Sequence, residues 1–216
     1  MTEQNFEQMR RAMVASQLRT TGVNDPRVVA AMSAVPRERF VPAERCALAY
    51  ADALVPLGHG RALNPPMALG RMLTEARLRG DEKALVIGAA TGYSAAVLAR
   101  LAASVTALEE DGELARFARK ALEGTGVAIV EGPLTEGHEA GGPYDFILID
   151  GAVEYVPEAI VAQIADGGEF ALALVDEGVT RLSVGRVVAG AFGTTAVSDA
   201  AAAMLPGFEK PRGFSF

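Results

Sequence analysis

The feature that most constrains the fold is a series of uninterrupted apolar runs that alternate with helical patterns after residue 80. Runs that are apolar at every position belong to strands buried on both faces, which is typical of a parallel sheet covered by helices. We therefore expect an α/β fold with a mostly parallel sheet of about seven strands and helices on both faces. Five strands are predicted at residues 84–87, 104–110, 127–132, 144–150 and 168–176, and two more within residues 182–205.

The first 80 residues have a different character. Helical spacing of apolar residues predicts an amphipathic helix over residues 4–18. Asn24-Asp25-Pro26 is typical of a capped helix start, and Pro65-Pro66 opens another helix. Residues 53–70 hold three prolines, three glycines and a histidine, so we expect an ordered loop that acts as an active-site or lid segment.

Composition indicates one globular domain covering residues 1–216. Half of the 216 residues are hydrophobic and 22% are charged, which is ordinary for a soluble protein. The net charge of −7 argues against a broad nucleic-acid-binding face. Four arginines are candidates for a local basic mouth, although such scattered residues more often form a solvated face: Arg37, Arg39, Arg45 and Arg61.

The chain ends and the single cysteine add little chemistry. The N-terminus lacks the apolar core of a secretory signal, and no apolar stretch is long enough for a bilayer, so we expect a cytoplasmic protein without membrane contact. Cys46 has no disulfide partner and nothing near it indicates a metal site, so we interpret it as a small buried residue. The C-terminal phenylalanines indicate a sheet-edge strand or a partner-binding tail, of which we favour packing: Phe208, Phe214 and Phe216.

Four short segments should meet at the carboxyl ends of neighbouring strands, where open parallel sheets bind ligands. A loop of small residues lets a ligand approach the backbone, and an acidic residue about 20 positions later accepts hydrogen bonds from ribose hydroxyls. Capping of the next helix is the alternative role for the acidic residues after the second strand, and turn formation for Asp150. The segments are Gly88-Ala89-Ala90-Thr91-Gly92, Glu109-Glu110, Gly132-Pro133-Leu134 and Asp150-Gly151-Ala152.

The spacing within the glycine loop narrows the choice of cofactor. Dinucleotide folds favour G-x-G-x-x-G because a pyrophosphate lies on the helix N-terminus, whereas this chain has Gly88-x-x-x-Gly92. A cofactor without phosphate, such as S-adenosylmethionine, makes less demand on that helix end.

Several further motifs run through most of the chain. They are Met13-Val14-x-x-Gln17-Leu18, VPRERFVP at 35–42, Ala49-Tyr50-x-Asp52, Pro56-Leu57-Gly58-x-Gly60, Gly88-x-x-Thr91-Gly92-Tyr93 and Pro143-Tyr144-Asp145. Together they resemble the protein-L-isoaspartate O-methyltransferase family, a branch of the Rossmann-like S-adenosylmethionine-dependent methyltransferases. The N-terminal motifs are specific to this family among methyltransferases.

The resemblance implies a role for each part of the chain and a reaction. Residues 1–80 would supply N-terminal helices and a substrate loop, and residues 81–216 the cofactor-binding core. The reaction would move the sulfonium methyl of S-adenosylmethionine to the carboxylate of isoaspartyl residues in damaged proteins, leaving S-adenosylhomocysteine. A carboxylate is ionised at pH 7, so orientation suffices and no general base is needed. The implied substrate-loop residues are Leu57, Gly58, His59 and Gly60, and the implied cofactor contacts are Gly88, Ala89, Ala90, Thr91, Gly92, Glu109, Glu110, Leu134 and Asp150.

The chain departs from the family at both sites. Where the family loop reads Gln-Thr-Ile-Ser-Gln-Pro, this chain reads Arg61-Ala62-Leu63-Asn64-Pro65-Pro66, so Arg61 and Asn64 become the candidate catalytic residues facing a substrate carboxylate. On the cofactor side, an acidic residue, a glycine and an aspartate are replaced by Val86, Ala90 and Pro133. The alternative function is therefore a methyltransferase fold that no longer catalyses and serves as a binding or scaffold module.

Overall fold

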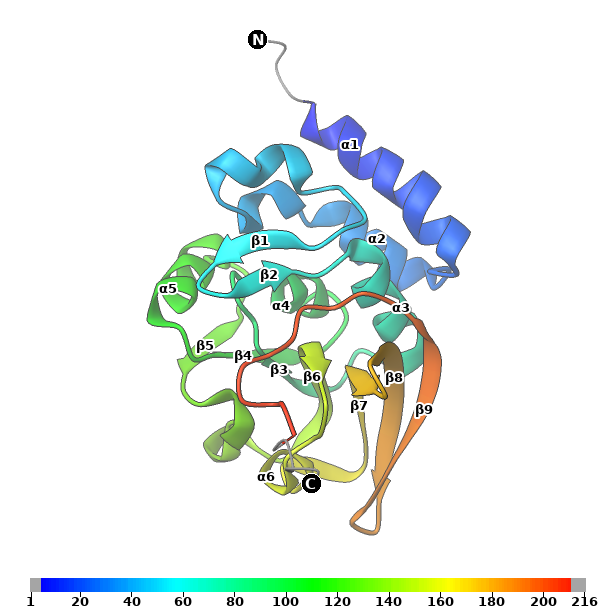
Figure 1. Cartoon of the computed structure of the whole chain (residues 1–216), viewed down its shortest axis with the longest axis vertical. Helices are drawn as coiled ribbons and strands as arrows, with labels where there is room; N and C mark the ends of the chain where they lie inside the picture. The colour runs from blue at the N-terminus through cyan, green and yellow to red at the C-terminus, as the bar shows by residue number, and fades with distance from the viewer. Residues whose placement is uncertain (1–4, 211–216) are drawn as a thin grey trace, which may run out of the picture.

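The computed structural model describes residues 5–210 and is organised around a seven-stranded sheet (Figure 1). The strand order is β5-β4-β3-β6-β7-β8-β9, in which the first five strands are parallel and the last two are antiparallel. The predicted mostly parallel, seven-stranded α/β sheet is therefore confirmed. The strands are β3 (Lys83–Ile87), β4 (Ser104–Glu109), β5 (Ala128–Glu131), β6 (Tyr144–Val153), β7 (Ile164–Asp176), β8 (Val179–Val188) and β9 (Ala191–Asp199).

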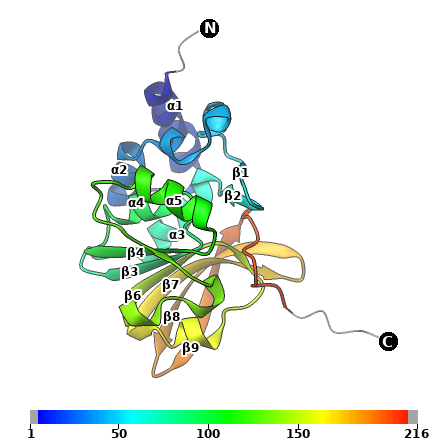
Figure 2. The same ribbon diagram turned by 90° about the vertical axis from the view of Figure 1, so that its left-hand side faces the viewer.

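Helices cover the two faces of the sheet unequally. One face packs against α3 (Pro66–Ala76), α4 (Tyr93–Leu98) and α5 (Gly112–Ala121), with α1 (Phe6–Met13) and α2 (Pro26–Ala34) beyond them (Figure 2). The opposite face carries α6 (Glu158–Val161), which packs against a 3-10 turn. The shorter helical turns are Val14–Leu18, Arg19–Thr21, Arg37–Phe40, Ala43–Leu48, Leu134–Glu136 and Glu139–Gly141.

Strand β3 shows why its sequence is apolar after Lys83. Ala84 and Val86 belong to the core between the sheet and the large helices, whereas Leu85 and Ile87 belong to the core on the opposite face. All four side chains are fully buried. Because successive side chains point to opposite faces, a strand with a core on each side has no position for a polar residue before its end.

The N-terminal helices follow their predicted starts. Helix α1 continues through a π-helical turn to Leu18, so the helix predicted to end there is confirmed over the described residues. Helix α2 begins at Pro26 with the Asp25 carboxylate accepting from the amide of Arg27 at 2.7 Å. Of the four arginines assigned to a solvated face or a basic mouth, Arg39 and Arg45 are exposed, but Arg37 and Arg61 are buried, so that prediction was wrong for them.

The prediction of an irregular loop over residues 53–70 was also wrong in part. This segment contains an antiparallel hairpin of β1 (Val55–Gly58) and β2 (Arg61–Leu63), followed by α3. Val55 and Leu57 are buried, whereas Pro56 and Gly58 are exposed, as in an edge strand that tolerates proline. His59 and Gly60 turn the chain with φ of 52° and 71°.

The segment of residues 200–208 returns from β9 to the end of β6 (Figure 1). Met204 bridges Ala152 in parallel, and Leu205 and Phe208 are buried, which confirms packing for Phe208. The alanines at 200–203 form neither helix nor strand. Phe214 and Phe216 lie outside the described residues.

Among residues 5–210, every helix is too short or too polar to cross a lipid bilayer.

The two-sided core predicts the stability of a strand variant. Leu85→Ala should lower the free energy of unfolding by about 2–5 kcal/mol, because it leaves a cavity at a fully buried position. Leu54→Ala, at a side chain that is 40% exposed, is the matched control and should change stability by less than about 0.5 kcal/mol. Chemical denaturation measures both, and equal effects would contradict the assignment of Leu85 to the core.

The N-terminus of α5 generates a pH-dependent prediction. The Asp111 carboxylate accepts from the amides of Leu114 and Glu113, at 3.0 and 2.9 Å, and these bonds hold its pKa below the ordinary 3.8. Asp111→Ala should therefore cost about 1 kcal/mol at pH 7. The folded-state pKa is the lower one, so the part of this stabilisation that depends on the charge is present above about pH 3.8 and is lost as the pH falls through the folded value. Asp111→Asn keeps the acceptor and should retain most of the stability without the pH dependence; denaturation at pH 7 and pH 3 separates the variants.

Candidate functional site

The loop after β3 has a positive φ at three of its five residues. Gly88, Ala90 and Gly92 have φ of 76°, 48° and 98°. This conformation costs a glycine little and an alanine roughly 1–2 kcal/mol, so Ala90 carries a real cost. The amides of Gly88 and Ala89 both donate to the Leu108 carbonyl at 3.0 Å, which fixes the loop against the end of β4.

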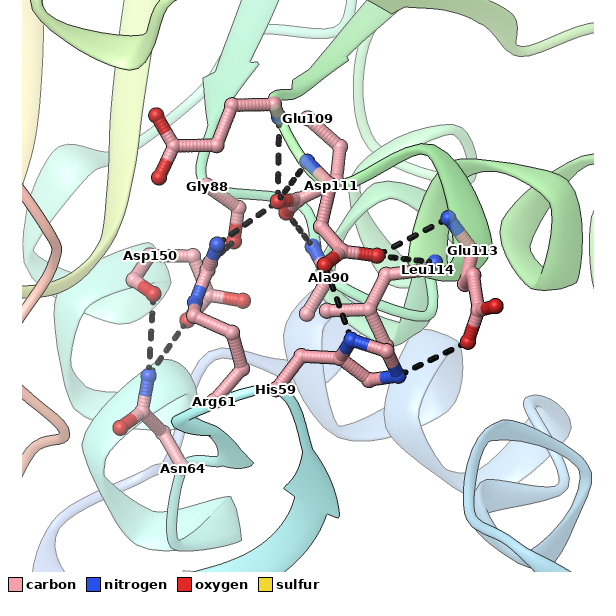
Figure 3. Close-up of polar contacts among 11 residues, drawn as sticks. His59, Arg61, Asn64, Gly88, Ala90, Glu109, Asp111, Glu113, Leu114 and Asp150 are labelled. Atoms are coloured by element: carbon pink, nitrogen blue, oxygen red, sulfur yellow. Dashed lines mark hydrogen bonds and ion pairs between the residues drawn. The ribbon is translucent and has the colours of Figure 1, made fainter.

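The Glu109 carboxylate turns back onto this loop from the end of β4 (Figure 3). It accepts from the Ala90 amide at 2.6 Å and from the amides of Glu110 and Asp111 at 3.0 and 3.1 Å. The helix cap is Asp111, not Glu109. The capping role proposed for the acidic run thus belongs to Asp111, and Glu110 lies at the surface.

Arg61 meets Glu109 in the interior of the protein. Its Nη1 donates to Glu109 Oε1 at 2.7 Å and its Nη2 donates to the Gly88 carbonyl at 2.9 Å (Figure 3). The two side chains are 4% and 0% exposed. Sequence reasoning placed Arg61 in a substrate loop, and the structure adds its contact with the cofactor loop, which no local pattern signals.

Asn64 joins three segments that are distant in the sequence. Its amide Nδ2 donates to Asp150 Oδ1 at 2.9 Å, and its Oδ1 accepts from the Ala203 amide at 2.8 Å. Asn64 is buried and Asp150 is partly buried. The contact brings the candidate substrate loop to the carboxyl end of β6, beside the Gly88 loop.

Two of the candidate cofactor contacts have packing roles in this structure. Thr91 donates its hydroxyl to the Phe40 carbonyl at 2.6 Å, which ties the Arg37–Phe40 turn to the loop. Leu134 is buried in the core on the face that carries α6. Leu57 is also buried, whereas Gly58, His59 and Gly60 form the exposed turn of the β1–β2 hairpin.

His59 connects this turn to α5. Its Nδ1 lies 3.0 Å from Asp111 Oδ2 and its Nε2 lies 3.0 Å from Glu113 Oε2 (Figure 3). The two acidic partners belong to the first turn of α5 and its cap. The hairpin is therefore held beside the acidic end of β4. The sequence did not predict this contact, because Asp111 and Glu113 lie 52 and 54 positions after His59.

The burial of Arg37 was not predicted from the sequence either. Its Nε donates to the Ala49 carbonyl at 2.5 Å, its Nη2 donates to the Asn64 carbonyl, and its guanidinium lies 4.6 Å from the centre of the Tyr93 ring. Burial lowers the pKa of Arg37. The prolines at both ends of VPRERFVP were the available signal of a fixed segment, since they restrict the backbone that positions Arg37.

Solved structures with the same architecture include two protein-L-isoaspartate O-methyltransferases. One has a TM-score of 0.78 at 20% identity, covering 94% of this chain and 66% of that chain. The other, a Plasmodium falciparum protein described as a beta-aspartate methyltransferase in complex with S-adenosyl-L-homocysteine, has a TM-score of 0.75 at 18% identity, covering 93% and 97%. At these identities the likeness shows the Rossmann-like methyltransferase fold.

Sequence comparison is more specific. A relative named protein-L-isoaspartate O-methyltransferase 1 from Rhodopseudomonas palustris is 39% identical over 182 residues, covering 82% of this chain and 74% of the relative. A protein-L-isoaspartate O-methyltransferase from Koribacter versatilis is 37% identical over 193 residues, covering 88% and 87%. The family model described as protein-L-isoaspartate(D-aspartate) O-methyltransferase matches residues 9–186. This chain therefore belongs to the protein-L-isoaspartate O-methyltransferase family.

Proposed function

We propose that this chain transfers the methyl group of S-adenosylmethionine to the free carboxylate of isoaspartyl residues in damaged proteins. Family membership over residues 9–186 supports this reaction. At the site, one observation carries the proposal: the positive-φ loop after β3 meets a buried carboxylate at the end of β4, through the 2.6 Å bond from the Ala90 amide to Glu109. This is the place where open parallel sheets hold the ribose of a cofactor.

The chemical types of the residues around the loop suit S-adenosylmethionine. Gly88 has no side chain, so a ligand could approach its backbone once Leu205, whose Cδ2 would lie 2.8 Å from an added Cβ, is displaced. Glu109 offers a carboxylate for ribose hydroxyls, and nothing in the loop is arranged for a pyrophosphate. The fit requires Arg61 to leave Glu109, because the guanidinium now holds that carboxylate.

The protein's own task in this reaction is orientation. Bound S-adenosylmethionine would supply an electrophilic methyl group. The acceptor carboxylate is already ionised at pH 7, so the protein has to hold it in line with the methyl group and exclude water. Arg61 and Asn64 are the proposed groups for the acceptor carboxylate, because both lie where β2 and the residue after it reach the carboxyl ends of β3 and β6.

We also propose that the acceptors are isoaspartyl-containing proteins or peptides of the cytoplasm. The net charge of −7 suits neutral or basic peptide segments better than nucleic acid.

Methyl transfer tests the proposal directly. With tritiated S-adenosylmethionine at saturation, label should enter a peptide containing isoaspartate and should not enter the same peptide containing aspartate, which is the matched control. The ester is base-labile, so the reaction is stopped in acid. Equal absence of label from both peptides would contradict the enzymatic function and favour a binding or scaffold role.

The loop position of Asn64 gives a second prediction. Asn64→Ser restores the family's hydroxyl and frees Asp150 from the amide, so methyl transfer should rise about fivefold, the value of one hydrogen bond of about 1 kcal/mol. Asn64→Ala removes the same contacts without adding a hydroxyl and should show no such rise. An unchanged or lower rate for Asn64→Ser would mean that the link to Asp150 and Ala203 is the main role of Asn64.

A further inference from the structure

The centre of the site is filled by the protein's own side chains. Arg61 bonds the Glu109 carboxylate at 2.7 Å and the Gly88 carbonyl at 2.9 Å, inside the protein. Arg61 stands where the family pattern has glutamine, so this cation is a property of the chain and not of the family motif. A guanidinium is always charged, and it is the partner that a buried carboxylate binds best.

The Glu109 carboxylate is enclosed in this arrangement. A carboxylate has about four lone-pair sites. Oε1 accepts from Arg61 and from the amides of Glu110 and Asp111, at 2.7, 3.0 and 3.1 Å, and Oε2 accepts from the Ala90 amide at 2.6 Å. The residue is fully buried. Oε1 is thus fully engaged and Oε2 keeps one lone pair, but burial closes off both oxygens. A ribose hydroxyl can therefore reach Glu109 only after the groups that cover it, Arg61 among them, have moved.

Leu205 closes the loop from the other side. An ideal Cβ on Gly88 would lie 2.8 Å from Leu205 Cδ2 and 3.1 Å from Arg61 Nη2, so these two side chains cover the Gly88 backbone. Leu205 is held by its own amide, which donates to the Ala152 carbonyl at 2.9 Å, and by the bond from the Ala203 amide to Asn64 at 2.8 Å. This segment lies beyond the family match, which ends at residue 186.

We propose that Arg61 on Glu109 and Leu205 on Gly88 form a closed arrangement that competes with the cofactor for its own site. The inference rests on the proposed function. In the closed arrangement the Glu109 charge is paired, so cofactor binds only the fraction of molecules in which Arg61 and Leu205 have moved away. The apparent affinity is reduced by that fraction, and the ribose hydroxyls replace the guanidinium as partners of Glu109.

Calorimetric titration with S-adenosylhomocysteine tests the competition. Arg61→Gln, which restores the family residue, should bind the ligand at least tenfold more tightly than the unaltered protein. Arg181→Gln is the matched control, because it makes the same change in an exposed ion pair on β8 (3.4 Å to Asp176), and its affinity should equal that of the unaltered protein. Tighter binding is the informative sign, since a merely structural role for Arg61 would leave affinity unchanged or lower it.

The outcomes separate this inference from the proposed function. Equal or weaker binding by Arg61→Gln, with measurable binding by the unaltered protein, overturns the closed arrangement and leaves the function standing. No binding by either protein overturns both. If circular dichroism shows that Arg61→Gln does not fold, Leu205→Ala decides: it removes the cover over Gly88 and should bind about threefold or more tightly, and equal or weaker binding overturns the proposal.

Discussion

Burial of the parallel sheet on both faces is the constraint on which the rest of this structure depends. It makes the central residues of strands β3, β4 and β6 mostly apolar, so charged groups lie near the strand ends. Glu109 is the last residue of β4, and Asp150 follows the apolar part of β6. The site is therefore located by exclusion: the core leaves charged groups only the strand ends, and Glu109 and Asp150 lie towards the carboxyl ends.

A charge at that edge still has to be satisfied. Glu109 is fully buried, and an unpaired carboxylate there would be strongly destabilising, so the guanidinium of Arg61 and three backbone amides stabilise it. The same lone pairs are what a ribose would need. The same atoms therefore determine both the stability of the protein without ligand and its affinity for ligand. Ala90, whose φ is 48°, adds strain to the same loop.

The sequence predicted those features that depend on local pattern. Continuous apolar runs located β3 to β7, Asp25-Pro26 located α2, and the offset between Gly88 and Glu109 brought the loop and the carboxylate together. Sequence patterns failed where contacts between residues distant in the chain determine the structure. Pro56 concealed β1, because proline argues against a strand unless its edge position is known. Arg37 and Arg61 carry no local mark of burial, since the partners that make burial possible, such as the Asn64 carbonyl and Glu109, lie far along the chain.

The contact between Asn64 and the Ala203 amide spans 139 positions, and its consequence concerns the order in which the protein is made. On the ribosome, Arg61, Gly88 and Glu109 emerge and can assemble long before residues 200–208 exist. Until then Gly88 lacks the cover of Leu205. In native-state hydrogen exchange the same segment should reopen before the sheet beneath it.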